Sequence, residues 1–534
     1  MHILHIAPAP WASRARAGAA ALLLGAGLLG GCAMLPPGVE RTPSQAVAAS
    51  AQEALGRLAA ASVADAGGSA FRPLPLSSYA MDARLTLVRQ AQRTLDVQYY
   101  LLENDLTGHT LARALRDAAA RGVRVRLLVD DLYTADSEQM LLGLAAHPNV
   151  EVRLFNPFPS GRWSALTRWL FALGDFSRIN HRTHNKMLIA DGAFAIAGGR
   201  NIADEYFFTS QGGNFIDFDL LVAGDALPRM QAIFDTYWNS PRIYPLQAVQ
   251  PTRRPAAEWQ ADFERLTADA VGAYPAPPPE PDLLGWQPLS ADIATPPLRL
   301  LQGRIDVFAD DPEKVSGRAE TGRDTTTVTA RVGRAVATAR TEVVIGSPYF
   351  IPGEPGLAAM RQALDNAVRI EVITNSLASN DEPFASAAYG RYRVQMLKMG
   401  VALYEVDSRQ LHNDSFFAAA LHSSIGRSHS KLIVIDRRVT FVGSMNLDLR
   451  SSRLNTELGM LVDSPALAQQ VLALAARVRD VGSYRLRLAQ PGDRLEWVGQ
   501  ERGADKVWDH EPDVDLRTRL QLWLVFPFVS ESLL

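Results

Sequence analysis

The sequence has very little cysteine and no marked excess of charge of either sign. Cys32 is the only cysteine among 534 residues, which excludes an intramolecular disulfide and a zinc site built from several cysteines. Lysine and arginine number 54 against 57 aspartate and glutamate, a formal net charge of −3. This balance gives no indication of a nucleic-acid-binding surface, so no nucleic-acid partner is expected. The apolar content of 47% is sufficient for large cores.

The N-terminus also lacks an apolar run long enough to span a membrane comfortably. Two arginines precede an apolar run over residues 17–29, which leads into Leu-Gly-Gly-Cys32. That order is typical of a secretory signal peptide ending in a bacterial lipobox. We expect a signal peptide over 1–31, a lipid on Cys32 and a lipidated tether over 32–75 that holds the protein on a membrane surface. The alternative is an uncleaved short anchor.

The residue after the cysteine bears on where the protein is attached. By resemblance to lipoproteins that lack aspartate at this position, Ala33 favours the outer membrane. The expected location is therefore the bacterial cell envelope, with the protein lipid-anchored at the periplasmic face of the outer membrane. Export also agrees with the absence of further cysteines.

One short pattern occurs twice in this chain. The first copy contains His184, Lys186, Asp191, Gly198 and Asn201, and the second contains His429, Lys431, Asp436, Gly443 and Asn446. In both copies lysine follows histidine by 2 residues, aspartate by 7, glycine by 14 and asparagine by 17. A single match of this kind is weak, but two copies with the same distal glycine and asparagine indicate a real duplication.

Each histidine precedes a segment that is predicted to be a buried strand. Residues 187–190 and 432–435 are apolar, and second apolar runs follow at 193–197 and 439–442. Alternate side chains of a strand share a face, so the histidine and lysine of each copy should point the same way. The glycines permit a tight turn that brings each asparagine back toward that face.

Two facing copies would supply two imidazoles, two ammonium groups and two carboxamides. That set suits a phosphodiester, because one histidine can attack phosphorus while the other protonates the leaving oxygen. The lysine and asparagine donors would hold the charged phosphoryl oxygens.

The duplicated pattern with its trailing glycine and asparagine resembles the signature of the phospholipase D superfamily. Flanking phrases resemble the C-type bacterial cardiolipin synthases, at residues 95–108, 183–207, 347–356 and 429–459. The resemblance runs from about Tyr79 to the C-terminus. It implies an α/β fold of two phospholipase D-like lobes packed around one composite active site. It also implies phospholipid substrates and a reaction that uses no cofactor and no metal.

The resemblance assigns roles to the motif residues. His184 would be the nucleophile that forms a phosphohistidine, and His429 the general acid and then base, although the sequence itself is symmetric and permits the reverse. The phosphate would be bound by Lys186, Lys431, Asn201 and Asn446. Gly199 stands where the family often has serine, whereas Ser444 keeps the hydroxyl, so the sequence leaves open whether both halves of the site contribute a hydroxyl hydrogen bond.

Four acidic residues are further candidates. Asp191 and Asp436 have an odd spacing from the lysines, which places them off the histidine face and favours a structural role. Asp217 and Glu457 lie downstream of the motifs at matching positions, and such a carboxylate would fix the tautomer of a histidine. The alternative is that each is an ordinary acid at a strand edge.

Strands alternating with helices predict α/β layers in both halves. We expect strands at 94–100, 123–129, 341–345 and 369–373, and helices at 110–121, 325–340 and 357–367. Twelve of the 32 prolines lie between Pro241 and Pro297, which favours an interdomain connection with neither helix nor strand. The predicted domains are a first lobe over 76–240 with its motif at 178–205, a connection over 241–300, and a second lobe over 301–534 with its motif at 423–450.

Two histidines and two segments outside this pattern are candidates for metal binding or lipid contact. His181 and His184 form an HxxH pair, but on an extended segment they lack the one-face geometry of a helical zinc site. His109 is expected at the surface. A basic and aromatic segment over 155–169 and the apolar C-terminus from Leu520 are candidates for lipid contact, with core packing as the alternative.

The expected reaction is transfer of a phosphatidyl group through phosphohistidine, most specifically cardiolipin synthesis from phosphatidylglycerol and a second phospholipid. The alternatives are hydrolysis of phospholipids to phosphatidic acid, a phospholipase D-type nuclease, and a non-catalytic lipid-binding lipoprotein. Transfer requires a site that excludes water. The aromatic residues expected to line it, unless they only pack the core, are Tyr206, Phe207, Phe208, Tyr349 and Phe350.

Overall fold

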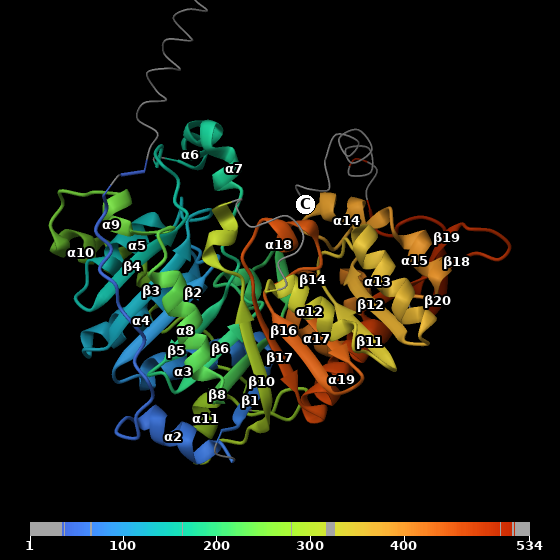
Figure 1. The fold of residues 1–534 in the computed structure, drawn as a ribbon, viewed down its shortest axis with the longest axis horizontal. Helices are drawn as coiled ribbons and strands as arrows, with labels where there is room; N and C mark the ends of the chain where they lie inside the picture. The colour runs from blue at the N-terminus through green and yellow to red at the C-terminus, as the bar shows by residue number, and fades with distance from the viewer. Residues whose placement is uncertain are drawn as a thin grey trace, which may run out of the picture.

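A computed structural model describes most of the chain. The described residues are 35–36, 38–64, 67–162, 164–278, 280–316, 326–501, 503–514 and 517. They form two α/β lobes side by side, as predicted (Figure 1). The predicted signal peptide, Cys32 and the C-terminal segment from Leu520 lie outside the described residues. Within the described part, no helix has the length and apolar character needed to cross a bilayer.

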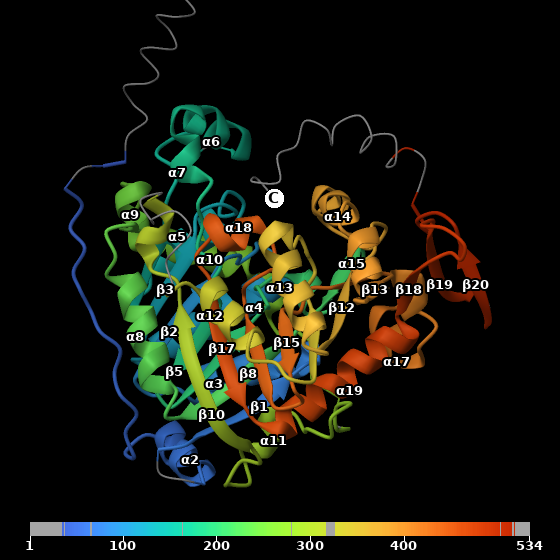
Figure 2. The same cartoon turned by 45° about the vertical axis from the view of Figure 1, so that its right-hand side comes forward.

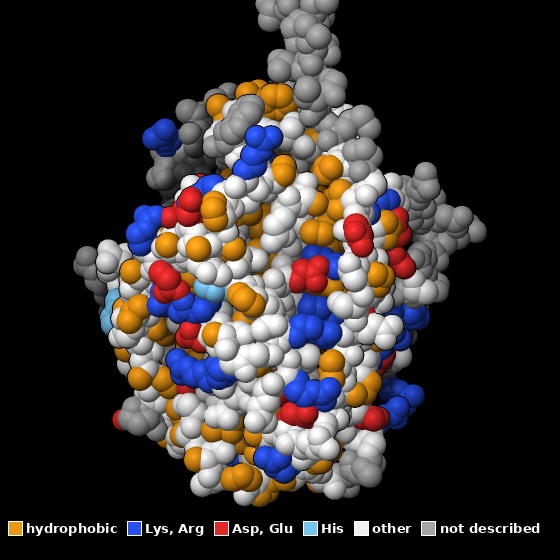
Figure 3. Space-filling model, turned by 90° about the vertical axis from the view of Figure 1, so that its left-hand side faces the viewer, with side chains coloured by type: hydrophobic (Ala, Val, Ile, Leu, Met, Phe, Trp, Pro, Cys, Tyr) orange, Lys and Arg blue, Asp and Glu red, His pale blue; other side chains and the backbone are white. Residues whose placement is uncertain are grey.

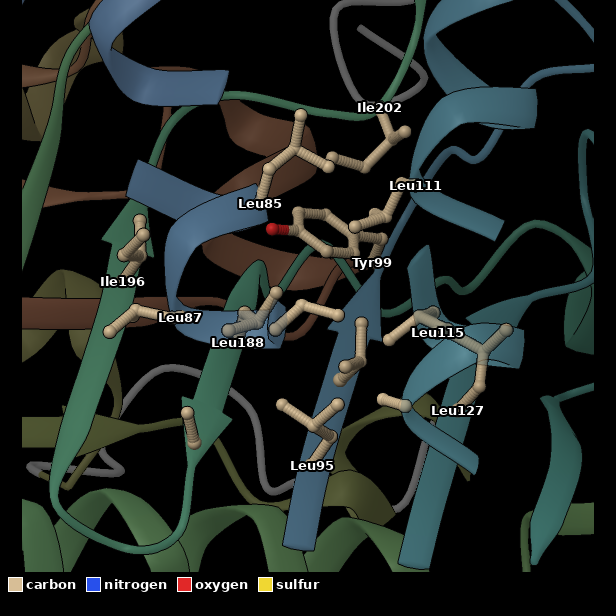
Figure 4. Close-up of a cluster of buried hydrophobic side chains, with 14 of the residues drawn as sticks. Leu85, Leu87, Leu95, Tyr99, Leu111, Leu115, Leu127, Leu188, Ile196 and Ile202 are labelled. Atoms are coloured by element: carbon tan, nitrogen blue, oxygen red, sulfur yellow. The ribbon is translucent and has the colours of Figure 1, made fainter. Parts of the chain in front are cut away.

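The first lobe is built on a mixed sheet. Its strands are β2 (Thr94–Tyr99), β3 (Arg124–Asp130), β4 (Val150–Phe155), β5 (Met187–Ala190), β6 (Phe194–Gly198), β8 (Asp219–Gly224) and β9 (Ile243–Pro245). Strands β2, β3 and β4 are parallel, and β5 pairs antiparallel with β2. The helices α3 (Ser77–Gln90), α4 (Leu106–Ala120) and α5 (Glu138–Ala145) bury one face of the sheet (Figure 4). Helix α8 (Leu227–Trp238) buries the other.

The second lobe repeats this order. Its strands are β10 (Leu301–Ala309), β11 (Glu342–Gly346), β12 (Arg369–Asn375), β13 (Ala402–Val406), β15 (Leu432–Ile435), β16 (Val439–Gly443), β17 (Leu458–Asp463), β18 (Ser483–Leu488), β19 (Leu495–Glu501) and β20 (Ala504–Trp508). Strands β11, β12 and β13 are parallel, and β15 pairs antiparallel with β11. The helices α12 (Val328–Val336), α13 (Gly353–Asp365) and α15 (Arg393–Met399) cover one face, and α19 (Pro465–Val481) covers the other.

Strand β1 (Ser69–Leu74) joins the two sheets into one. It pairs along its whole length with β8 of the first lobe, and residues 69–71 also pair with β10 of the second. Helix α2 (Ala54–Ser62) packs beside it with Leu55 buried. The predicted tether over 32–75 is therefore wrong for its second half, because the buried side chains of β1 make it a central strand.

The predicted strands and helices are confirmed, with shifted ends. Helix α4 begins four residues earlier than predicted, because the Asp105 carboxylate caps it by accepting from the Gly108 N–H at 2.8 Å. Helix α12 is shorter than predicted and begins after its own cap, Thr327.

The proline-rich connection is not free of regular structure, contrary to prediction. It contains β9, α9 (Leu246–Val249), α10 (Ala256–Leu266) and α11 (Leu289–Asp292). Pro255 and Pro288 each stand directly before a helix, where a missing N–H is harmless. The fully buried Phe263 of α10 packs against Gly143 of α5. Pro245, Pro255 and Pro288 thus mark helix starts in a segment that packs largely on the first lobe.

The motif aspartates fasten each histidine-bearing hairpin to its sheet. Asp191 follows β5 and accepts hydrogen bonds of 2.8–2.9 Å from the N–H groups of Gln92, Arg93 and Thr94, at the start of β2. Asp436 does the same at the start of β11, for Arg340, Thr341 and Glu342. A carboxylate that accepts several backbone N–H bonds holds two chain segments in register.

We predict unequal effects of removing the two aspartates. Asp191 is 2% exposed, so Asp191→Ala would leave buried donors without partners and lower the free energy of unfolding by about 2–4 kcal/mol. Asp436 is half-buried, so water replaces its carboxylate in Asp436→Ala, at a cost of about 1 kcal/mol. Denaturant unfolding followed by circular dichroism measures both, and equal losses would contradict the account.

Candidate active site

The two histidines meet at the contact between the lobes, held there by backbone hydrogen bonds. The N–H of His184 donates to the carbonyl of Thr456 at 2.8 Å, and that of His429 donates to the carbonyl of Ile216 at 2.8 Å. Strand β14 (Ile425–Ser428) of the second lobe also pairs in parallel with β7 (Gly213–Ile216) of the first. Each histidine segment is therefore bound to the segment of the other lobe that carries an acid.

The acids are exchanged between the lobes. Nδ1 of His184 lies 3.0 Å from Oε2 of Glu457, and Nδ1 of His429 lies 2.6 Å from Oδ2 of Asp217. All four side chains are buried. The sequence indicated these two acids but not that each serves the histidine of the opposite copy. With Nδ1 engaged by a carboxylate, Nε2 is the nitrogen left for chemistry.

The two acids are held differently, which explains the difference between the motif copies. Glu457 accepts hydrogen bonds from the hydroxyls of Ser444 and Ser451. Asp217 faces Gly199, and a Cβ at that glycine would lie 2.2 Å from its Oδ1. The shorter carboxylate thus occupies the space that a serine would need. The second copy supplies a hydroxyl at this motif position and the first copy supplies none.

Two buried ammonium groups lie beside the histidines. Lys186 Nζ donates to the carbonyl of His184 at 2.7 Å, and Lys431 Nζ donates to that of His429 at 2.6 Å. Burial lowers the pKa of Lys186 well below its usual value and lowers that of Lys431 to about 8, against the attraction of nearby carboxylates. An anion between these groups would restore their charge, so this part of the site is suited to a phosphate.

The histidines are neutral before an anion enters. Burial lowers the pKa of His184 to about 4 despite the opposing charge of Glu457. Burial, followed by the charge of Lys431, holds the pKa of His429 well below its usual value. Their free nitrogens differ, because Nε2 of His429 lies 2.9 Å from Lys431 Nζ, whereas no described residue forms a hydrogen bond with Nε2 of His184.

The two motif asparagines are buried with unused hydrogen-bonding capacity. Asn201 donates to the hydroxyl of Tyr206 at 2.9 Å. Within the described residues, the Oδ1 atoms of Asn201 and Asn446 have no hydrogen-bond partner. The oxygen and nitrogen of an amide are interchangeable by a flip, so either end of each side chain can face a ligand.

Aromatic rings enclose both histidines. The ring centroids of Tyr206 and Phe215 each lie 5.0 Å from that of His429, and Tyr100 lies 5.0 Å from His184. Tyr206 was predicted, but Tyr100 and Phe215 were not. The position of Tyr100 just after the parallel strand β2 is a signal that could have indicated it.

The other predicted aromatics take different places. Phe350 lies in the core of the second lobe, Phe207 packs in that of the first, and Phe208 lines an apolar pocket beneath β14 and β7. The hydroxyl of Tyr349 donates to Asp381 at 2.6 Å.

The remaining histidines do not extend the site. Nδ1 of His181 lies 2.6 Å from the carbonyl of Ser177. Among the described residues, no group of three or more histidine, cysteine or acidic side chains is placed to hold a metal ion. His109 was expected at the surface, but it is buried between Asp269 and Asn104.

Comparisons with known proteins agree with this geometry. A family model described as cardiolipin synthase, PLD-like domain, matches residues 85–238 and 333–478. Cardiolipin synthase C of Escherichia coli (strain K12) is 34% identical over 86% of this chain and 95% of its own length. A cardiolipin synthase of Oceanobacillus iheyensis is 25% identical over 72% of this chain and 63% of its own. The crystal structure of phosphatidylserine synthase from Haemophilus influenzae Rd KW20 shares the fold, with a TM-score of 0.54 at 15% identity, over 87% of this chain and 94% of that one.

We predict that Gly199→Ala disables the His429 side of the site. The added Cβ forces the Asp217 carboxylate away, so the rate should fall about 10–100-fold, as it does when a supporting carboxylate is lost. The double variant with Asp217→Asn should be no slower than Asp217→Asn alone. Gly333→Ala is the matched control, since nothing lies within 4 Å of its Cβ. Phospholipid turnover measures all four, and wild-type activity in Gly199→Ala would refute the packing argument.

We predict that a tetrahedral dianion binds the site and leaves as the pH rises. Sulfate requires the Lys431 ammonium, whose pKa in the free site is about 8, so affinity should fall at least tenfold per pH unit above that value, and more steeply if Lys186 or His429 also takes up a proton on binding. Affinity falls as the pH rises because the bound anion stabilises the protonated lysine, and the free site loses that proton above its pKa. Calorimetric titration between pH 7 and 9.5 is the test, with Lys431→Met as the control that loses affinity at every pH. A flat profile would count against the phosphate site.

Proposed function

This chain belongs to the family of phospholipase D-like domains of the cardiolipin synthases, and from that premise we propose that it makes cardiolipin from phosphatidylglycerol and a second phospholipid. It is an enzyme of the phospholipase D type, a class that transfers or hydrolyses phosphatidyl groups. The observation that carries the proposal is the single buried site with two histidines, each held by a carboxylate from the opposite lobe. Such a pair can perform two successive displacements at one phosphorus atom.

In the first step the donor lipid is cleaved. Nε2 of His184 attacks phosphorus, the bond from phosphorus to the headgroup oxygen breaks, and His429 gives its proton to that oxygen. The choice of His184 as nucleophile is supported by its Nε2, which no described residue occupies. The phosphodiester anion raises the pKa of His429, which burial and Lys431 otherwise hold low, so His429 carries its proton once the substrate is bound.

In the second step the acceptor takes the phosphatidyl group. A hydroxyl of the phosphatidylglycerol headgroup gives its proton to the now neutral His429, and its oxygen attacks phosphorus. The bond between phosphorus and His184 breaks, which restores both histidines to their starting state. Lys186 and Lys431 stabilise the charge on the phosphoryl oxygens in both steps.

Transfer in place of hydrolysis is supported by the enclosure of the histidines. His184 and His429 are 6% and 4% exposed, and aromatic rings pack against both. Water competes with the acceptor at about 55 M, so a transferase must exclude it from the intermediate and position the lipid hydroxyl.

The test is to supply the enzyme with isotopically labelled phosphatidylglycerol, with and without phosphatidylethanolamine, and to follow the products by mass spectrometry. We expect cardiolipin as the main product and phosphatidic acid as a minor one. His184→Ala and His429→Ala should each remove nearly all turnover, and the double variant should lose little more, because the pair acts as a unit. Phosphatidic acid as the main product under every acceptor condition would make the enzyme a phospholipase.

A further inference from the structure

Large hydrophobic side chains are exposed together on one projecting element. This hairpin consists of α6 (Ala165–Ala172) and α7 (Phe176–Ile179), and it stands out at one end of the molecule (Figures 1 and 2). Its exposed side chains, which we term the hairpin surface, are Leu166 (70% exposed), Leu170 (56%), Phe176 (48%) and Trp169 (39%). They are four of the nine large hydrophobic side chains that are exposed among the described residues. Figure 3 shows hydrophobic side chains gathered at this end.

The polar and apolar sides of the hairpin are inverted relative to an ordinary surface helix. Arg168, from the same helix as Leu166 and Leu170, is 1% exposed and forms an ion pair with Glu138 at 2.5 Å. Arg162 is also buried and pairs with Asp131 at 2.7 Å. Charged groups are normally left in water and leucines removed from it. Here the charges lock the base of the hairpin to the first lobe, and the leucines face outward.

The base of the hairpin is continuous with the active site. Asp130, next to Asp131, accepts from the N–H of Thr183 at 2.9 Å, one residue before His184. Tyr133 in the same loop is 47% exposed and contacts Tyr100, whose ring contacts that of His184. A row of rings thus leads from the surface beside the hairpin to His184.

The charge around the hairpin fits an anionic lipid surface. On α18 (Leu449–Arg453), Arg450 donates to the side chain and the carbonyl of Asn180, which ends α7. In the part of the chain that the structure describes, neither Arg450 nor Arg453 forms an ion pair with a carboxylate. Burial raises the pKa of Glu382 and of Asp448, and Arg450 is close enough to oppose that rise, but it forms no ion pair with them, and its guanidinium beside the hairpin is suited to the negative headgroups of a bilayer.

The start of the described chain lies at the same end of the molecule. In both views the blue start of the coloured trace lies near α6 and α7 (Figures 1 and 2). Arg41 donates to the carbonyl of Ile243, which pairs with Phe155 at the end of β4, shortly before the hairpin. Cys32, the predicted site of lipid attachment, precedes residue 35 by three positions. A lipid there and the hairpin surface can engage one membrane together.

We propose that the hairpin surface inserts into the interface of an anionic phospholipid bilayer and sets the exposed ring of Tyr133 against it. Lipids then reach His184 from the bilayer without crossing water. This proposal goes beyond the proposed reaction, because it concerns binding to the membrane. It applies equally to a variant without catalytic activity.

The test uses the full chain with Cys32→Ser, so that no acyl group on that residue contributes to binding. Vesicles of phosphatidylglycerol and phosphatidylethanolamine in equal parts are floated with the protein. The double variant Leu166→Asp and Leu170→Asp should bind at least tenfold more weakly, because two apolar side chains no longer enter the interface. The matched control is Val271→Asp with Val507→Asp, which changes two exposed valines elsewhere (65% and 45% exposed) and should bind like the parent.

A second measurement guards against misfolding and reports depth directly. Brominated lipids should quench the fluorescence of Trp169 if its ring enters the bilayer interface. The Trp169→Phe variant should therefore lose most of the quenching, whereas the control Trp259→Phe, on α10, should keep it. The leucine variant should retain its turnover of phosphatidylglycerol in detergent micelles and lose most of its turnover on vesicles. His184→Ala should bind vesicles like the parent, which separates docking from catalysis.

Three results would overturn the proposal. One is unchanged vesicle binding in the leucine variant, and another is quenching that survives Trp169→Phe. The third is a parent protein that sediments as a dimer and a leucine variant that sediments as a monomer but binds vesicles as well as the parent does. That result would make the surface an interface between two copies of this chain.

Discussion

The exchange of acidic residues between the lobes is the constraint on which the rest of the structure depends. His184 is paired with Glu457, directly before β17 of the second lobe, and His429 is paired with Asp217, just before β8 of the first. A lobe alone would hold a histidine without its acid and an acid without its histidine. Burying either unpaired is costly. The backbone pairing of β7 with β14, and β1 between the two sheets, keep the lobes in the register that the exchange requires.

The site has ionisable groups inside and aromatic rings beside them, and this contrast supports the proposal that its substrate is an anionic ester. Two lysines and two histidines lose hydration on burial, and the pKa of each is lowered as a result. A phosphodiester restores that charge, whereas a neutral molecule does not. The rings of Tyr100, Tyr206 and Phe215 meanwhile limit the entry of water. The same protein therefore buries ionisable groups in its site, and the hairpin exposes hydrophobic side chains to the outside.

The sheet and helix order was predictable because both halves follow local rules. Apolar runs of four to five residues next to Asp and Gly predicted β5, β6, β15 and β16 correctly. The segment over 241–300 was predicted wrongly, since proline content alone does not distinguish a linker from a series of helix starts. Strand β1 was also missed, because composition alone did not indicate it. Its residues form a strand because β8 and β10, both distant in sequence, pair with it on either side.

The sequence by itself determined which residues are brought together in each half of the site, because spacing of 2 to 17 residues along a strand and its turn fixes the placement of histidine, lysine and asparagine within one copy. Only the tertiary structure decided how the copies combine. The acid of each histidine lies 273 or 212 residues away, and no local spacing encodes that pairing. The glycine at position 199 is explained by the tertiary structure as well. The Asp217 carboxylate lies where a side chain at 199 would be, and it is bound there to the histidine of the other lobe. Local periodicity specifies the strands and the residues of each motif copy, and long-range packing specifies which acid pairs with which histidine.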